Sequence, residues 1–156
     1  ALGAAYFYHL TQNSMEVTLP RLLEKARGAG WKIVVRGRDE GRMVWLDQKL
    51  WALGDTSFLA HGLAGGPHDA LQPVLLTTSP EIPDAIGCVM SVDGADVSAE
   101  EVNAVERVCI LFDGHDPEAV QHARGQWKAL TDAGCAAQYW SEETGNWQKK
   151  AESGGG

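Results

Sequence analysis

The chain has 156 residues, 44% of them hydrophobic and 22% charged, which is the size and composition of one ordinary globular domain. Thirteen basic residues against 21 acidic ones give a formal net charge of −8, so the surface as a whole should repel nucleic acid, although one local basic patch is compatible with this balance. The longest apolar runs, such as Val108–Phe112, are too short to cross a bilayer. No basic and then apolar leader opens the chain, so we expect a cytoplasmic protein without a membrane contact.

Segments of strand-like composition alternate with segments whose apolar residues repeat at helical spacing. The first half predicts a strand at Ala5–Leu10, a helix that Thr18 caps and that Gly28 and Gly30 end, a strand at Lys32–Arg36, and a helix from Asp39 to about Leu53. The second half predicts strands at Val74–Thr77, Gly87–Val92 and Arg107–Phe112, a short helix from Ser98, a long helix from Asp116 to about Ala133, and an extended piece at Gln138–Trp140. This alternation indicates a single α/β domain of three layers with a mainly parallel central sheet, spanning residues 3–150 and followed by a disordered tail at 151–156.

An open parallel sheet often binds nucleotides, but the sequence lacks the loop that would hold their phosphates. The first predicted strand–helix junction, HLTQNSMEVTLP, contains no glycine, and no GxxxxGK[ST] motif occurs in the chain. The glycines at Gly28 and Gly30 follow a helix and are better explained as its C-cap. We therefore expect a fold that resembles a nucleotide-binding domain without its phosphate site, and we expect no cofactor.

Residues 55–73 form a long irregular stretch between the second predicted helix and the next strand. Loops of this length in a compact domain are usually functional or mobile. The three cysteines, Cys88, Cys109 and Cys135, are widely spaced and form no CxxC pair, and two of them lie in strand-like apolar context. We interpret them as reduced thiols of the core and not as metal ligands or nucleophiles.

The best candidate for an enzyme site follows the predicted strand at Arg107–Phe112. Asp113, His115 and Asp116 would lie at the carboxyl edge of the sheet, where they could hold a metal or act as acid and base in a small hydrolase or phosphatase. The simpler interpretation is a turn in which Asp116 caps the following helix, and we favour it. A second group, His61, His68 and Asp69, fits no familiar metal-site spacing, and we expect no metal.

The most unusual residues lie on the last long helix. Arg124, Trp127 and Lys128 stand at positions i, i+3 and i+4 and so share one side of it. The two cations repel each other by roughly 0.2–0.5 kcal/mol, which is explained if a partner with a negative charge and an apolar body docks there. The alternative is that the Trp127 ring faces the core while the cations lie along the surface.

A second cluster of large side chains surrounds the irregular stretch. Trp51 ends the second predicted helix, and Phe58, His61 and Leu63 follow in the loop, where they would line a groove.

Together these segments resemble the chi subunit of bacterial DNA polymerase III. The resemblance rests on L-D-x-x-L-W, then S-F-x-x-H-x-L-A-G, then A-R-x-x-W-K-A in the last helix, with the opening F-Y-H-L strand and the closing Tyr139, Trp140 and Trp147. It covers nearly the whole chain. This family implies a non-catalytic adaptor that joins the clamp-loader assembly through the psi subunit, touches DNA only indirectly, and binds the acidic, Pro-Phe-ended C-terminal tail of single-stranded DNA-binding protein.

Carried over by position, the resemblance implies one tail-binding pocket, made of Trp51, Phe58, His61, Leu63, Arg124, Trp127 and Lys128. Arg124 is the better clamp for the terminal carboxylate because its fork bonds both oxygens, and Lys128 would attract the acidic residues that precede it. A peptide held in this way is expected to bind near the micromolar range and more weakly as salt rises. Val120 and His122 depart from the charge or aliphatic bulk of some relatives.

Overall fold

The computed structural model describes residues 4–11, 15–51, 61–63, 74–78, 86–141 and 147–153, with backbone alone for 15–17, 20, 50–51, 61–63 and 153. Its elements are, in chain order, β1 (Ala4–Leu10), α1 (Met15–Gly28), β2 (Lys32–Arg36), α2 (Glu40–Trp51), β3 (His61–Leu63), β4 (Val74–Thr77), β5 (Ile86–Ser91), α3 (Ala99–Ala104), β6 (Arg107–Asp113), α4 (Pro117–Asp132), β7 (Ala136–Ser141) and β8 (Gln148–Ser153). None of the described helices is both long and apolar enough to span a membrane.

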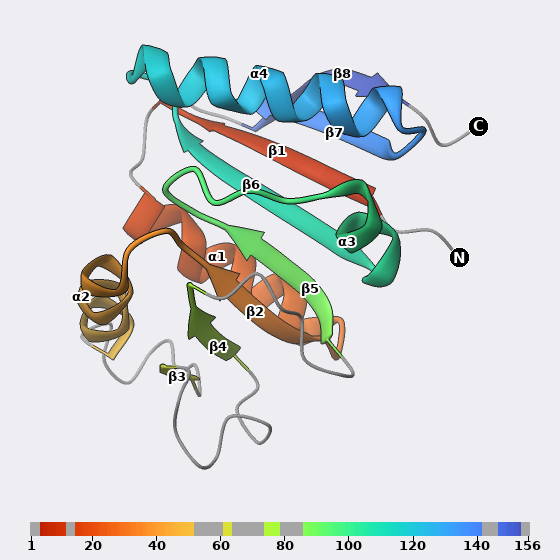
Figure 1. Ribbon diagram of the computed structural model, residues 1–156. Coiled ribbons are helices and arrows are strands. Elements are labelled where there is room, and N and C mark those ends of the chain that lie inside the picture. The colour runs from red at the N-terminus through yellow and green to blue at the C-terminus, as the bar shows by residue number, and fades with distance from the viewer. Residues whose placement is uncertain are drawn as a thin grey trace.

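The strands form one sheet in the order β3-β4-β2-β5-β6-β1-β7-β8 (Figure 1). Every neighbouring pair runs parallel except β7 and β8, which are antiparallel at one edge. The predicted α/β class with a mainly parallel sheet is confirmed.

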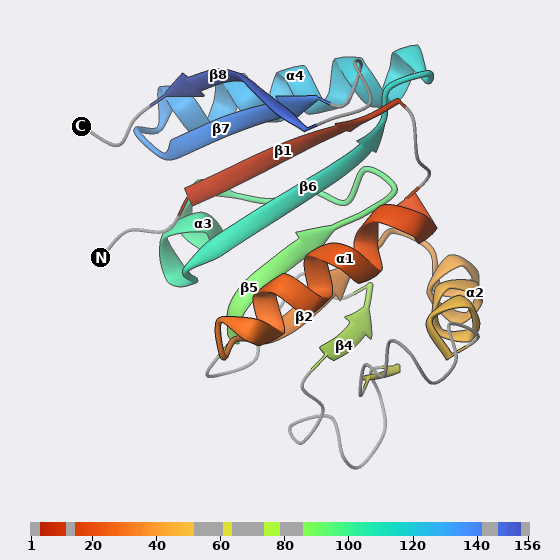
Figure 2. The ribbon, with the colours of Figure 1, turned by 180° about the vertical axis from the view of Figure 1, so that it is seen from behind.

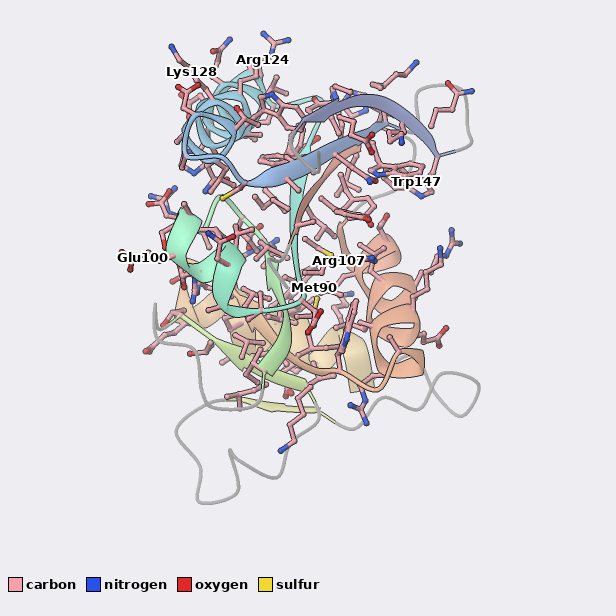
Figure 3. The ribbon with its side chains drawn as sticks, turned by 90° about the vertical axis from the view of Figure 1, so that its right-hand side faces the viewer. Met90, Glu100, Arg107, Arg124, Lys128 and Trp147 are labelled. Atoms are coloured by element: carbon pink, nitrogen blue, oxygen red, sulfur yellow. The ribbon has the colours of Figure 1, made fainter. Side chains whose placement is uncertain are left out.

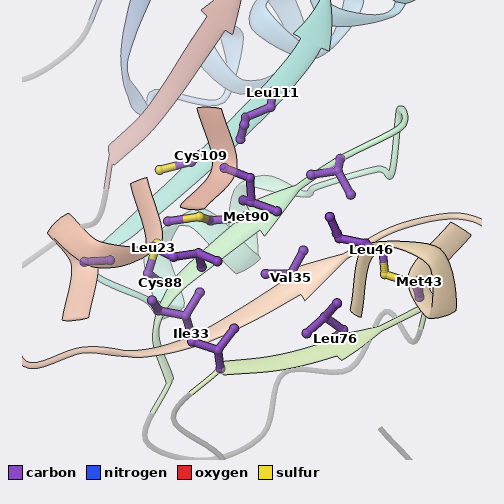
Figure 4. Packing of buried hydrophobic residues seen from close by; sticks show 14 of the residues in the cluster. Leu23, Ile33, Val35, Met43, Leu46, Leu76, Cys88, Met90, Cys109 and Leu111 are labelled. Carbon is purple, nitrogen blue, oxygen red and sulfur yellow. The ribbon is translucent and has the colours of Figure 1, made fainter. Parts of the chain in front are cut away.

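Helices cover both faces of the sheet, so the predicted three layers are also confirmed. On one face α1 and α2 bury Leu19, Leu23 and Leu46 against the sheet, and this cluster is shown in Figure 4. On the other face α3 and α4 contribute Val102 and Leu130 to a second cluster. Figure 2, seen from behind, shows α1 and α2 in front of the sheet and α4 behind it.

The helix starts show why the capping residues of the sequence matter. Asp116 precedes α4, and its carboxylate accepts a hydrogen bond from the N–H of Glu118 while Pro117 takes the first helical position. Ser98 and Glu101 form a reciprocal capping box at α3. Both starts agree with the prediction from the sequence.

Three predictions about element ends are wrong. The first helix begins at Met15, so Thr18 lies inside it, where its side chain is buried. His61–Leu63, expected to be irregular, pairs in parallel with β4 as an edge strand. Residues 151–153, expected in a disordered tail, belong to β8, which pairs with β7 and is held by a side-chain hydrogen bond from Gln138 to Glu152.

The three cysteines are free and buried, as predicted. Cys88 and Cys109 lie on neighbouring strands in the α1-side cluster. A hydrogen bond between the Cys88 thiol and the Cys109 side chain, together with burial, raises the pKa of Cys88 well above its usual value. Cys88 therefore stays protonated at neutral pH and behaves as a small apolar residue.

Candidate functional site

The outer side of α4 carries two exposed cations one turn apart. Arg124 and Lys128 point away from the sheet into solvent (Figure 3). Within the described part of the chain, no carboxylate lies within ion-pair distance of either side chain. In a protein with a net charge of −8, this pair is a local concentration of positive charge.

Trp127 forms the base of this helix surface. Its ring packs edge-on against Phe7, with centroids 5.4 Å apart, and against Tyr139 at 6.0 Å. The alternative from the sequence, in which the Trp127 ring faces the core while the cations lie along the surface, therefore agrees with these ring contacts. Trp127 is nonetheless only partly buried, so part of the ring remains open to solvent beside the two cations.

The other four residues of the predicted pocket are not brought to α4. Trp51 ends α2, and His61 and Leu63 lie in β3, the edge strand that α2 contacts. Five steps between neighbouring strands separate β3 from β1, about 24 Å at the usual strand spacing, and α2 and α4 lie on opposite faces of the sheet. Phe58 lies outside the described residues. The prediction of one pocket that contains both groups is wrong.

A groove of about 800 Å³ opens at the carboxyl edge of the parallel strands. Its walls come from the ends of β1 and β6, from the start of α2, and from the first half of α4. Its charged residues have both signs: Arg38 and Arg42 face Asp93, Asp113 and Glu118. This mixture does not favour a phosphate-rich ligand. No local pattern indicated Arg38 and Arg42, because the segments that form the groove are distant from one another in the chain.

The candidate acid–base group lies in this groove, but its side chains serve the turn. One Asp113 carboxylate oxygen accepts from the N–H of His115, and the Asp116 carboxylate caps α4. The Nε2 atom of His115 lies 2.8 Å from the backbone oxygen of Thr11. Among the residues that the structure describes, no group of three or more His, Cys, Asp or Glu could hold a metal. The turn-and-cap interpretation is confirmed, and a metal-dependent hydrolase is not favoured.

A buried ion pair supports the turn at the floor of the groove. Arg36, 3% exposed, lies 2.5 Å from Glu101, and its second nitrogen donates to the backbone oxygen of Asp96 at 3.2 Å. Arg42 holds the same turn from outside through two bonds to Asp93, at 3.1 and 3.2 Å. Gln126 of α4 adds a long hydrogen bond to the carbonyl of Ala95. Side chains from β2, α2 and α4 therefore hold the turn that borders the groove.

Fold and surface together define an α/β domain of the open-sheet class, without a phosphate-binding loop and with a cationic surface on its last long helix. Residues 3–138 match the model of the DNA polymerase III chi subunit family, HolC. The chain belongs to this family, whose members are accessory subunits of DNA polymerase III in DNA replication.

A curated relative agrees with this assignment. The chain is 23% identical over 111 residues, 68% of its own length and 67% of the relative's, to a protein of Rickettsia prowazekii (strain Madrid E) named as a probable DNA polymerase III subunit chi.

Proposed function

We propose that the chain is a non-catalytic adaptor of the clamp-loader assembly. In this role it binds the acidic, Phe-ended C-terminal tail of single-stranded DNA-binding protein through the surface of α4. The observation that carries the proposal is the pair of exposed cations, Arg124 and Lys128, beside the open part of the Trp127 ring. Family membership supports an association with other DNA polymerase III components, among which psi would be the direct partner.

The chemistry of the tail fits this surface. The planar guanidinium of Arg124 can form two parallel bonds to the terminal carboxylate, and Lys128, one turn further on, attracts the aspartates that precede it. The terminal ring would rest against the open part of Trp127, a contact worth about 0.5–1.5 kcal/mol beyond burial of area. Trp51, His61 and Leu63 lie too far away to take part, so the proposed site is confined to α4.

The test is a titration of a labelled peptide with the tail's acidic, Pro-Phe-ended sequence, followed by fluorescence anisotropy. Loss of one charge-assisted bond in Arg124→Ala should weaken binding by about 10- to 150-fold. A matched control is Arg21→Ala, since Arg21 is an exposed arginine on α1, at the opposite face of the sheet.

Salt provides the second arm of this test. Wild-type affinity should fall as the salt concentration rises from 0.05 to 0.5 M, and Arg124→Ala should show a weaker dependence, because it has lost one of the attracting charges. Equal affinity of Arg124→Ala and Arg21→Ala would refute the proposed tail site.

A further inference from the structure

The α1-side face of β1, β7 and β8 has no helix over it within the described part of the chain. In Figure 2, β1 and the β7–β8 hairpin lie in the open, whereas α1 lies in front of β5 and β2. The same strands are covered on their other face by α4. On this face of the described structure, three of the eight strands therefore lack the helical layer that covers the others, although sheet faces in three-layer domains are normally covered on both sides.

Aromatic side chains fill this uncovered face. Strand alternation and parallel register put Tyr8 beside Trp140 on the side away from α4. Trp147 packs edge-on against Tyr8, with ring centroids 5.3 Å apart. Tyr6, two residues before Tyr8, is on the same side, and all four rings are partly exposed. Tyr8 and Trp147 also pack against the α1-side core, so the exposed part of this row is limited to the outer edges of the rings. A row of partly exposed rings of this kind is compatible with a docking surface.

A cation lies at the end of the row, already oriented by the rings. The Arg107 guanidinium lies 4.1 Å from the centre of the Tyr6 ring and 5.2 Å from that of Trp31. In the described segments no carboxylate is within ion-pair distance of it. These two cation–π contacts orient the guanidinium, whose N–H groups are of the kind that binds a carboxylate through two parallel bonds. Lys149, which pairs with Trp140 across β7 and β8, lies on the same face, but Glu152 neutralises it through an ion pair at 3.0 Å, so Arg107 is, of these two, the cation left for a partner.

We infer that this aromatic–arginine face (Tyr6, Tyr8, Arg107, Trp140, Trp147 and Lys149) docks an amphipathic helix of another DNA polymerase III component. The helix would bring an apolar side and acidic residues. Three strands about 4.8 Å apart, the longest of seven residues, offer an area about 14 Å wide and 23 Å long, which fits one helix of about 15 residues. The occupant would complete the missing layer and supply a carboxylate for Arg107, and it could share Lys149 with Glu152. The partner's identity rests on the proposed adaptor function; the location does not.

The experiment measures binding of the full chain to clamp-loader complex of the source organism assembled without it, by biolayer interferometry. Arg107→Glu places like charge against the acidic helix and should weaken binding by at least about tenfold. Lys149→Glu, at an exposed position that cannot disturb the core, should weaken it in the same direction. Arg124→Glu on α4 is the matched control and should bind the complex as wild type does.

The same proteins are then titrated with the tail peptide, which separates the two proposals. Arg107→Glu and Lys149→Glu should retain tail affinity, whereas Arg124→Glu should lose it. Unchanged binding of the complex by both face variants would overturn the inference and leave the tail site standing. Binding of a single-stranded oligothymidylate that Arg107→Glu abolishes would also overturn it, because the rings would then be stacking platforms for bases.

Discussion

The buried ion pair between Arg36 and Glu101 should contribute more to stability than any exposed pair. Glu101→Gln keeps an oxygen for the capping box with Ser98 but removes the counter-charge of a guanidinium that is 3% exposed. Leaving a buried charge unpaired costs about 3–5 kcal/mol. For a chain of this length that corresponds to a fall in Tm of about 6–20 °C. Arg36→Met should cost less, because the Glu101 side chain is 19% exposed and can be hydrated.

The assay is urea denaturation followed by far-ultraviolet circular dichroism on Glu101→Gln, Arg36→Met and the double variant. The double variant should be more stable than the sum of the single losses predicts, by about 1–3 kcal/mol. Asp93→Asn is the matched control: it breaks the pair with Arg42, whose side chains are 43% and 29% exposed, and should cost under about 1 kcal/mol. Strict additivity, or a loss in Asp93→Asn equal to that in Glu101→Gln, would refute the reasoning.

Two further predictions concern backbone packing and pH. A methyl group at Gly114 would collide with the His9 ring and approach the Leu10 carbonyl oxygen to 2.7 Å, so Gly114→Ala should lower the free energy of unfolding by about 1–3 kcal/mol. Gly125 has open space around it on α4, so Gly125→Ala should raise the free energy of unfolding by up to about 1 kcal/mol. Thermal unfolding of the two variants tests both expectations. Because the pKa of Cys88 is raised in the folded state, its contribution to stability is complete below the unfolded value near 8.5 and is lost as pH rises above it, by up to about 1.4 kcal/mol per pH unit. Burial also raises the pKa of Cys135, so urea titrations of Cys88→Ala at pH 8–10 should show a shallower fall in stability than the wild type, and an equal fall would contradict the prediction.

Local physics made much of the fold predictable. The helix start at Asp116 was predicted correctly, because an Asp accepts a hydrogen bond from a free N–H group of the first turn and the following Pro has no N–H group to satisfy. Continuous apolar runs marked the buried parallel strands, such as β6. Short edge strands escaped detection: β3 has three residues and depends on its pairing with β4, and β8 is largely polar. Their structure comes from partners distant in sequence, which no local pattern reports.

The candidate site shows where sequence reasoning stops. Helical spacing correctly placed Arg124 and Lys128 together on an exposed surface, because i and i+4 positions are neighbours within one helix. Joining them to Trp51 required knowledge of the strand order and of the face that each helix covers, and neither is encoded in local spacing. The same limit hid Arg107, whose aromatic neighbours Tyr6 and Trp31 come from other segments of the chain.

Consecutive residues of β1 belong to the two opposite sides of the molecule: Phe7 supports Trp127 under α4, and Tyr8 supports Trp147 on the uncovered side. Both surfaces therefore depend on the register of β1. Inserting one residue into this strand would turn each ring to the opposite side of the sheet and would disrupt both surfaces. Ligands on α4 and on the open face would be held about 20 Å apart, one helix and one sheet thick, with no hinge between them. The domain would then hold the two ligands at a fixed separation, with β1 packed against both binding surfaces.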